Sequence, residues 1–215
     1  GDRRAWVVFV GADPKHEKVN WAVGRVQTPW VAILDADHVA DPAWLRTSLV
    51  VLRERGARMV QARRRPLTAL GLFQLWDALH QHVGCELYNE AFTRLGLSLY
   101  FTGTTAVIDR ELLLARPLRS CITEDVDFSY HWLMEGVRLA HNPHAGSAEE
   151  GSQDLYSFLA RRRRWASGHT EAFLRHLPRL GRAPLTLVER AQFLFHGAHY
   201  LVVAPVVLRH LSLGG

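Results

Sequence analysis

Two aspartates, Asp35 and Asp37, stand one residue apart directly after an apolar run, a spacing suited to binding a divalent cation. Residues 30–34 are all apolar, as in a strand that is covered on both faces of a parallel sheet. Ligand sites of open α/β sheets lie at the carboxyl ends of such strands. Mg²⁺ and Mn²⁺ prefer oxygen ligands and often bind one or two carboxylates together with substrate phosphates. Asp is also a common turn residue, so a purely structural role is the alternative.

A helical pattern late in the chain combines cations with an aromatic ring. Helical spacing places four residues on one face: Arg161, Arg164, Trp165 and Gly168. Arginine binds phosphate through two parallel hydrogen bonds, and aromatic faces commonly pack against sugar rings. The small glycine would allow another segment to approach this face closely.

Two lysines, Lys15 and Lys18, precede an earlier helical pattern and stand close to Asn20. Cations are unfavourable near a helix N-terminus, so a phosphate facing them would explain their position better than the helix does. Solvent-exposed lysines are the alternative.

A third acidic group, Glu124 and Asp125, follows Thr123 at the start of another predicted helix. Thr123 is suited to the N-cap, and acids in a first turn also suit the helix dipole, so a structural role is again the alternative. Upstream, Gly103 and Thr104 interrupt a run of strand-forming residues, which predicts a bend where the backbone approaches a ligand.

The elements that must position these residues alternate between strands and helices. A strand at 5–10, a helix and the strand before Asp35 predict a βαβ unit with a parallel sheet. The later pattern predicts, in order, a helix over 43–55 opened by Asp41-Pro42 and closed by Gly56, a strand at 59–62, a basic loop at 63–66, a helical stretch over 67–97, a helix from about 123 to 136, a strand at 137–140, a loop at 142–151, and a helix opened near Ser152 or Asp154. In the stretch 67–97 one apolar stripe is predicted to be core or membrane-facing: Leu72, Leu75, Trp76, Leu79 and Val83.

Composition favours one globular domain and gives no support for nucleic-acid binding. The chain has 215 residues, 48% of them hydrophobic, which is enough for one substantial core. Its net charge of +5 comes from basic residues of which all but two are arginine, yet no DNA- or RNA-reading motif accompanies them. Cys85 and Cys121 form no zinc pattern and are compatible with a reducing compartment.

The end of the chain predicts membrane contact. Residues 191–208 contain no Asp, Glu, Lys or Arg. An uncharged stretch of this length is at the lower limit for a membrane span. We therefore expect a catalytic domain over 1–182 and an interfacial or transmembrane helical segment over 183–215.

Taken in order, these motifs resemble the inverting family 2 glycosyltransferases, in the membrane branch of cellulose, chitin and hyaluronan synthases and ceramide glucosyltransferase-like enzymes. The matching motifs span nearly the whole chain: Lys15-x-x-Lys18-x-Asn20, Asp35-Ala36-Asp37-His38, Phe101-x-Gly103-Thr104, Thr123-Glu124-Asp125 and Arg161-x-x-Arg164-Trp165. The Asp-Ala-Asp-His tetrapeptide is particularly similar to cellulose synthases.

The resemblance implies an α/β fold of the GT-A type and a metal-dependent transfer of a sugar from a UDP-sugar to a glycan or lipid. In such enzymes Asp37, with Asp35 beside it, would hold Mg²⁺ or Mn²⁺ and the donor diphosphate, and Lys18 and Arg164 would contact that diphosphate. Membrane association with the catalytic face in the cytoplasm is implied as well.

The acceptor side follows from the same resemblance. Asp125 would be the general base for the acceptor hydroxyl, and Glu124 and Thr123 would help to shape its site. Trp165 would form the floor of the acceptor site, which would also include Arg161, Gly103 and Thr104.

Two departures from the family pattern bear on the product. Processive synthases carry Gln at the position of Arg161, so the sequence is closer there to enzymes that transfer a single sugar. The family's first two strands, which hold uracil and ribose, would precede Gly1. The alternatives from other classes are a non-catalytic nucleotide-binding module of the GT-A type and a basic module for a membrane surface or nucleic acid.

Overall fold

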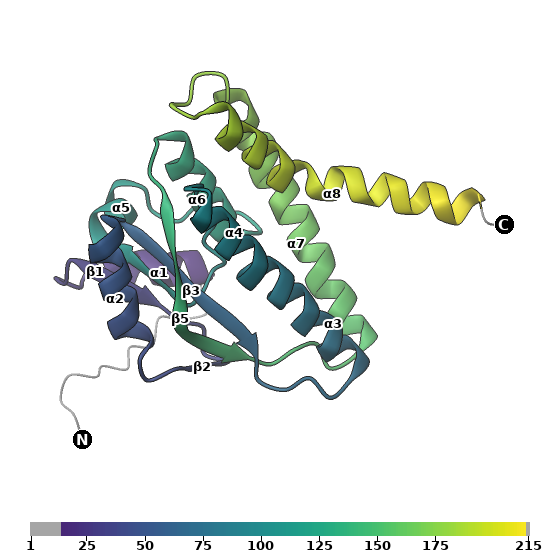
Figure 1. Ribbon diagram of the computed structural model, residues 1–215, viewed down its shortest axis with the longest axis horizontal. Helices are drawn as coiled ribbons and strands as arrows, with labels where there is room; N and C mark the ends of the chain where they lie inside the picture. The colour runs from purple at the N-terminus through teal and green to yellow at the C-terminus, as the bar shows by residue number, and fades with distance from the viewer. Residues whose placement is uncertain (1–13, 214–215) are drawn as a thin grey trace.

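The computed structural model describes residues 14–213, and a mixed five-stranded sheet lies at the centre of this part of the chain (Figure 1). Its strands lie in the order β1-β4-β3-β5-β2: β1 (Trp30–Ile33), β2 (His38–Ala40), β3 (Met59–Pro66), β4 (Ala106–Asp109) and β5 (Leu139–Glu149). β3 and β5 run parallel, whereas the other neighbours are antiparallel. The parallel partner predicted for β1, the strand at 5–10, lies outside the described residues.

Helices cover both faces of the sheet and continue as a separate layer. The helices are α1 (Lys15–Val23), α2 (Trp44–Arg55), α3 (Leu72–Gln81), η1 (His82–Tyr88), α4 (Asn89–Arg94), α5 (Arg110–Ala115), α6 (Glu124–Met134), α7 (Leu155–His176), η2 (Leu177–Arg179) and α8 (Leu187–Leu213). α6 packs on α7, which packs on the first half of α8. The C-terminal half of α8 extends away from the rest of the molecule (Figure 1).

The core forms on both faces of the sheet because alternate residues of a strand point to opposite sides. Met59 belongs to one buried cluster with Phe128 and Leu112, and its neighbour Val60 belongs to another with Trp44. A third cluster joins α6, α7 and α8 around Tyr130 and Phe193. The central strands are therefore covered on both faces, whereas β1, the strand for which the sequence predicted this, is an edge strand of the described sheet in which only Ile33 is buried.

Two strands are longer than the sequence pattern predicts. Residues 63–66 and 142–149 were expected to be loops, yet β3 and β5 pair in parallel as far as Pro66 and Glu149. The register shifts between Ala62 and Arg63, and pairing resumes at Gly146. A Cβ at Gly146 would lie 1.7 Å from the Arg63 carbonyl oxygen, so glycine permits this close approach. The loop predictions are wrong because the pairing partner, and not the local pattern, fixes where these strands end.

The predicted helical stretch over 67–97 is divided and has its polar face inward. It consists of α3, the π-helix η1 and α4, and residues 67–71 lie outside any helix. The side chains of α3 that are buried are polar, Asp77 and Gln81, whereas four residues of the apolar stripe are more than half exposed: Leu72, Leu75, Trp76 and Leu79. Of the two alternatives predicted for this stripe, core packing is wrong for these four residues, and membrane contact stays a prediction. Asp77 is held inside by the backbone N–H and hydroxyl of Ser152, at 2.8 and 2.7 Å, and by Arg162 at 2.5 Å.

Several helix boundaries agree with the sequence. α2 ends at Gly56, whose φ of 57° is left-handed, as expected for a C-terminal glycine. α2 begins after Ala43 and not at Pro42, because the Asp41 carboxylate accepts a hydrogen bond from the Ala43 N–H in a preceding turn. The predicted membrane segment falls within α8, and no helix among residues 14–213 is long and apolar enough to span a bilayer.

Candidate active site

A cavity of about 650 Å³ lies between the sheet and the helices η1, α6, α7 and α8. Most of the residues singled out in the sequence line it: Asp35, Asp37, Gly103, Thr123, Glu124, Asp125, Arg161, Arg164 and Trp165. Thr104 is buried behind the wall, where its hydroxyl accepts a hydrogen bond from the Asp35 N–H at 2.9 Å. Segments far apart in the sequence thus converge on one space.

One end of the cavity holds an acidic cluster on the turn between β1 and β2. The carboxylates of Asp35 and Asp37 and the imidazole of His38 each offer a ligand atom, and these atoms lie within 4.8 Å of one another. The turn is closed by a hydrogen bond from the His38 N–H to the Asp35 carbonyl at 3.1 Å. Such a donor set, two hard carboxylates and one imidazole nitrogen, fits a divalent cation.

The cation that faces this cluster is Lys15. Its ammonium lies 2.5 Å from Asp35 Oδ1 and donates to the Gly103 carbonyl at 2.7 Å. The structure does not bring Lys18 into the lining, because Lys18 lies one turn farther along α1 and is exposed. Spacing along the sequence could not separate the two lysines, since both are close to the helix start.

A buried network beside the cluster, most of which also lines the cavity, was missed by the sequence analysis. His38 Nδ1 lies 2.7 Å from Ser147 Oγ, and its Nε2 lies 3.6 Å from the carboxylate of Glu149. Glu149 is also bound by Arg64 and by Gln81 at 2.7 Å. Burial alone would raise the pKa of Glu149, but the hydrogen bond from His38 and the charge of Arg64 outweigh it and lower the pKa to about 2. Arg64, Ser147 and Glu149 fall in segments predicted to be loops, so nothing in the sequence indicated that Ser147 and Glu149 are buried and Arg64 half-buried.

Asp125 lies in the first turn of α6, opposite Lys15 across Gly103. Its Oδ1 accepts from the Val126 N–H at 2.9 Å, and the Ser129 hydroxyl donates to its carbonyl at 2.8 Å. The residue is half-buried and lines the cavity. This burial, with the neighbouring negative charge of Glu124, raises the pKa of Asp125 to about 7.

Close packing fixes the position of this turn. Gly103 has a φ of 83°, and a Cβ there would lie 3.0 Å from Asp125 Oδ2. Glycine therefore permits both the left-handed backbone conformation and the close approach of the Asp125 carboxylate. Thr123 stands at the N-cap of α6 as predicted, but its hydroxyl makes no capping hydrogen bond and is buried without a partner among the described residues. Gly168 of α7 faces it: a Cβ at Gly168 would lie 2.4 Å from Thr123 Cγ2.

The predicted face of α7 forms one wall of the cavity. The helix is capped by Asp154, which accepts from the Ser157 N–H at 2.7 Å, as the sequence indicates. Trp165 stacks on His80 with ring centroids 5.7 Å apart. Arg161 lies 3.6 Å from the buried Asp77. Arg161, Arg164 and Trp165 of this face line the same cavity as Asp125, and Gly168 of the same helix lies against Thr123.

A further part of the cavity is lined by aromatic rings and imidazoles from α3, η1, α4, α7 and α8 and from Tyr100, which lies outside any helix. We call this part the aromatic lobe; its residues are His80, Gly84, Tyr88, Phe92, Tyr100, Trp165, His169, Phe195, His196, His199 and Tyr200. Tyr100 stacks on His196 at 3.8 Å between ring centroids, and the Tyr130 hydroxyl lies 2.6 Å from His196 Nδ1. Burial lowers the pKa of His80 and of His169 to about 4, so both rings are neutral at pH 7. These histidines are scattered in sequence, which is why no motif indicated them.

Residues 30–214 match the sequence profile described as Glycosyl transferase family group 2. The chain belongs to this family. None of the curated proteins matches it significantly.

Solved structures of glycosyltransferases share its fold. A mannosyltransferase from Pyrobaculum calidifontis, in complex with GDP-Man and Mn²⁺, aligns over 91% of the chain with a TM-score of 0.65 and 20% identity. TarS 1-349 from S. aureus, in complex with UDP-GlcNAc, aligns over 85% with a TM-score of 0.54 and 14% identity. The chain spans about half the length of these proteins, 52% and 50%. The mixed α/β fold is therefore of the GT-A type, as the motifs predict.

Proposed function

We propose that the protein is a metal-dependent inverting glycosyltransferase that moves a sugar from a UDP-sugar to a hydroxyl of a glycan or lipid. The observation that carries this proposal is the position of Asp125. A carboxyl with a pKa raised to about 7 shares one cavity with the acidic cluster and with the cations Lys15 and Arg164. A base, a cation site and phosphate-binding groups are the parts that such a transfer needs.

The acidic cluster would hold the metal. Asp37 is exposed to the cavity, and Asp35 and His38 stand beside it, so all three can reach one ion. Ser147 holds His38 Nδ1, the kind of support that orients a metal-binding imidazole. A bound Mg²⁺ or Mn²⁺ would neutralise charge on the nucleoside diphosphate as it leaves.

Lys15 and Arg164 would bind the phosphates themselves. Both line the cavity, and Lys15 is already anchored by the Gly103 carbonyl on the side where Asp125 lies. Arginine offers a planar pair of donors that matches a phosphate. Lys15 thus takes the role that the resemblance assigned to Lys18. The complexes of the two similar structures, with GDP-Man and with UDP-GlcNAc, support a nucleotide-sugar donor.

Asp125 would accept the proton of the acceptor hydroxyl. A single base on the side opposite the leaving diphosphate gives attack from behind and inversion at the anomeric carbon, which differs from the paired carboxylates of glycoside hydrolases. Trp165, stacked on His80, presents a ring face on which the acceptor can rest. Glu124 acts on Asp125 through its charge.

The membrane branch and the product belong to this proposal as well. The Asp-Ala-Asp-His motif is like that of cellulose synthases and favours β-glycan synthesis, whereas Arg161 in place of Gln favours transfer of single sugars. Membrane association with a cytoplasmic catalytic face stays a prediction. The domain division after residue 182 also stays a prediction.

The test uses the full-length gene product in membranes and a panel of UDP-sugars, with GDP-mannose included. We expect metal-dependent release of the nucleoside diphosphate with one donor, lost with EDTA, and at least 100-fold slower in Asp125→Asn because general base catalysis contributes about that much. Donor binding should be retained in the variant. Transfer at the wild-type rate by Asp125→Asn would remove Asp125 as the base, and no release with any donor would overturn the proposed function.

A further inference from the structure

We propose that the acceptor hydroxyl is carried on a long apolar chain, a lipid, and that this chain lies in the aromatic lobe. The inference rests on the proposed function, and it selects one of the two acceptor classes that the function leaves open. Three observations carry it: the chemistry of the lobe, an open position in its wall, and the surface onto which it opens.

The aromatic lobe is chemically apolar. Its residues are aromatic rings, imidazoles and one glycine, and the polar groups that line the cavity next to them are the amides of Gln81 and Asn89 and the guanidinium groups of Arg161 and Arg164. The imidazoles of His80 and His169 are neutral, because burial lowers both pKa values to about 4. A glycan displays hydroxyls in all directions and needs many hydrogen-bonding partners, whereas a hydrocarbon chain needs only contact area. The lobe offers mostly contact area.

The wall of the lobe has a gap at Gly84. This residue lies in the π-helix η1, a rare form that is frequent at functional sites. A Cβ placed on Gly84 would meet no atom within 4 Å, although the residue lines the cavity. A ligand can therefore lie directly on the backbone of η1 at this point.

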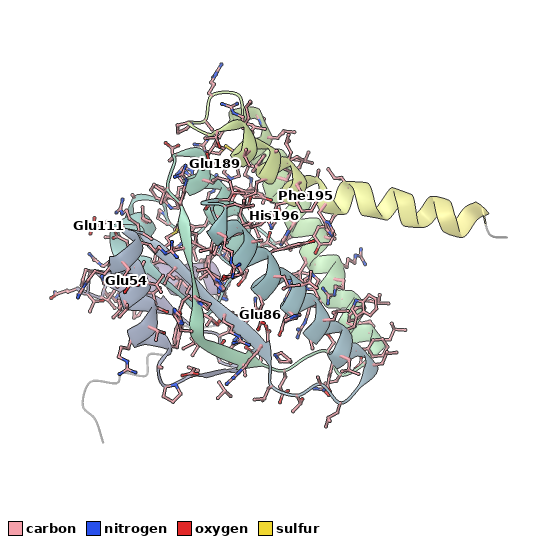
Figure 2. All side chains as sticks on the ribbon, in the orientation of Figure 1. Glu54, Glu86, Glu111, Glu189, Phe195 and His196 are labelled. Atoms are coloured by element: carbon pink, nitrogen blue, oxygen red, sulfur yellow. The ribbon has the colours of Figure 1, made fainter. Side chains whose placement is uncertain are left out.

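The lobe opens onto an apolar surface. Tyr88 of η1 and Phe195 of α8 both line the cavity and are nevertheless 46% and 60% exposed, so the lining continues to the outside. Figure 2 shows Phe195 and His196 next to each other on α8. On the other side, the exposed stripe of α3 (Leu72, Leu75, Trp76 and Leu79) ends one residue before His80 of the lobe.

A lipid surface is the occupant that fits this edge. Exposed apolar patches of this kind mark membrane or protein contacts. Beyond Phe195, α8 continues through 201–208, a segment of only apolar residues, in the half of the helix that extends away from the molecule (Figure 1). A lipid that enters beside Tyr88 and Phe195 could present its headgroup hydroxyl to Asp125 while its chain lies in the aromatic lobe.

The first experiment asks where the transferred sugar goes. The full-length gene product is mixed with radiolabelled donor and either vesicles of total lipid from the source organism or the aqueous extract of the same cells, and products are partitioned between chloroform–methanol and water. We expect label in the organic phase, dependent on the vesicles and absent with Asp125→Asn. Label in the aqueous phase or in insoluble polymer would overturn the lipid acceptor and leave the proposed function standing. No transfer and no nucleotide release would overturn both.

The second experiment places a large side chain at Gly84, where the wall of the lobe has its gap. Gly84→Leu should lower transfer to lipid at least tenfold, mainly through a higher KM for the acceptor, while nucleotide and metal binding stay at wild-type values. Gly181→Leu is the matched control, because a Cβ there also meets nothing within 4 Å and Gly181 lies outside the cavity. Circular dichroism checks that both variants fold. Unchanged acceptor kinetics in a folded Gly84→Leu would overturn the position of the chain, as would an equal loss in Gly181→Leu.

Discussion

At the scale of single residues, the catalytic proposal depends on how one carboxyl is held close to neutrality. Asp125 is buried beside a second acid, and its pKa of about 7 makes it a base that is half ionised near neutral pH. A base with a pKa near the working pH is deprotonated in a large fraction of the molecules and still binds the abstracted proton well. The motif Thr-Glu-Asp shows the residue types, but the pKa arises from the surrounding packing.

The charge of Glu124 can be removed to test this account. Asp125 must be ionised to act, so transfer should rise with pH and reach half its maximum near pH 7. Glu124→Gln removes a negative charge that raises the pKa of Asp125, and the acidic limb should therefore move to lower pH. The pH profile of kcat/KM measures this shift. Glu150→Gln is the control, since Glu150 lies outside the cavity lining. An acidic limb that stays in place would contradict the coupling.

His38 offers a second prediction at this scale. If its imidazole completes the metal site, His38→Asn should weaken Mn²⁺ binding about tenfold or more. Titration followed by the EPR signal of free Mn²⁺ measures the affinity without any turnover. Val39→Asn provides the control, because Val39 is an exposed neighbour outside the cavity lining. Equal Mn²⁺ affinity in His38→Asn and the wild type would restrict the site to the two aspartates.

At the scale of elements, the contact between α6 and α7 aligns the base with the acceptor wall. Gly168 lies against Thr123, two residues before Asp125, and a Cβ there would lie 2.9 Å from the Thr123 backbone nitrogen. Because backbone cannot rotate away as a side chain can, a larger residue at 168 must push the two elements apart.

Gly168→Ala should therefore reduce both stability and turnover. We expect a loss of about 1–3 kcal/mol in the free energy of unfolding, as for other overpacked positions. Urea denaturation measures the loss, and kcat should fall because Asp125 and Trp165 move relative to each other. Gly181→Ala should change neither quantity. Full stability and activity in Gly168→Ala would show that the contact has room to adjust.

Elements were predictable where local rules decide them. α2 and its terminal Gly56, α7 and its cap Asp154, and the bend at Gly103 all follow from residue preferences within a few positions. The extensions of β3 and β5 were not predictable, because they depend on pairing between segments about 80 residues apart. The inward polar face of α3 was missed for a similar reason, since its partners come from elsewhere in the chain.

At the scale of the whole molecule, the main residues of the candidate site could be predicted, but the full set of residues that line it could not. The ordered motifs placed Asp35, Asp37, Asp125, Arg164 and Trp165 in one cavity, as the structure has them. The choice of Lys15 over Lys18, the Glu149 network and the aromatic lobe came only with the fold. Each depends on which side chains from separate segments meet, and that information is not in any single segment.

The inward polar face of α3 also orders events during synthesis. Asp77 reaches its buried partners Ser152 and Arg162 across 75 and 85 residues of chain. A ribosome therefore releases α3 well before the residues that hold its polar side. In that interval the apolar stripe is already complete, because its four residues lie within a single helix. The polar side of α3 therefore stays without its native partners until α7 has been synthesised, while its apolar side is already formed.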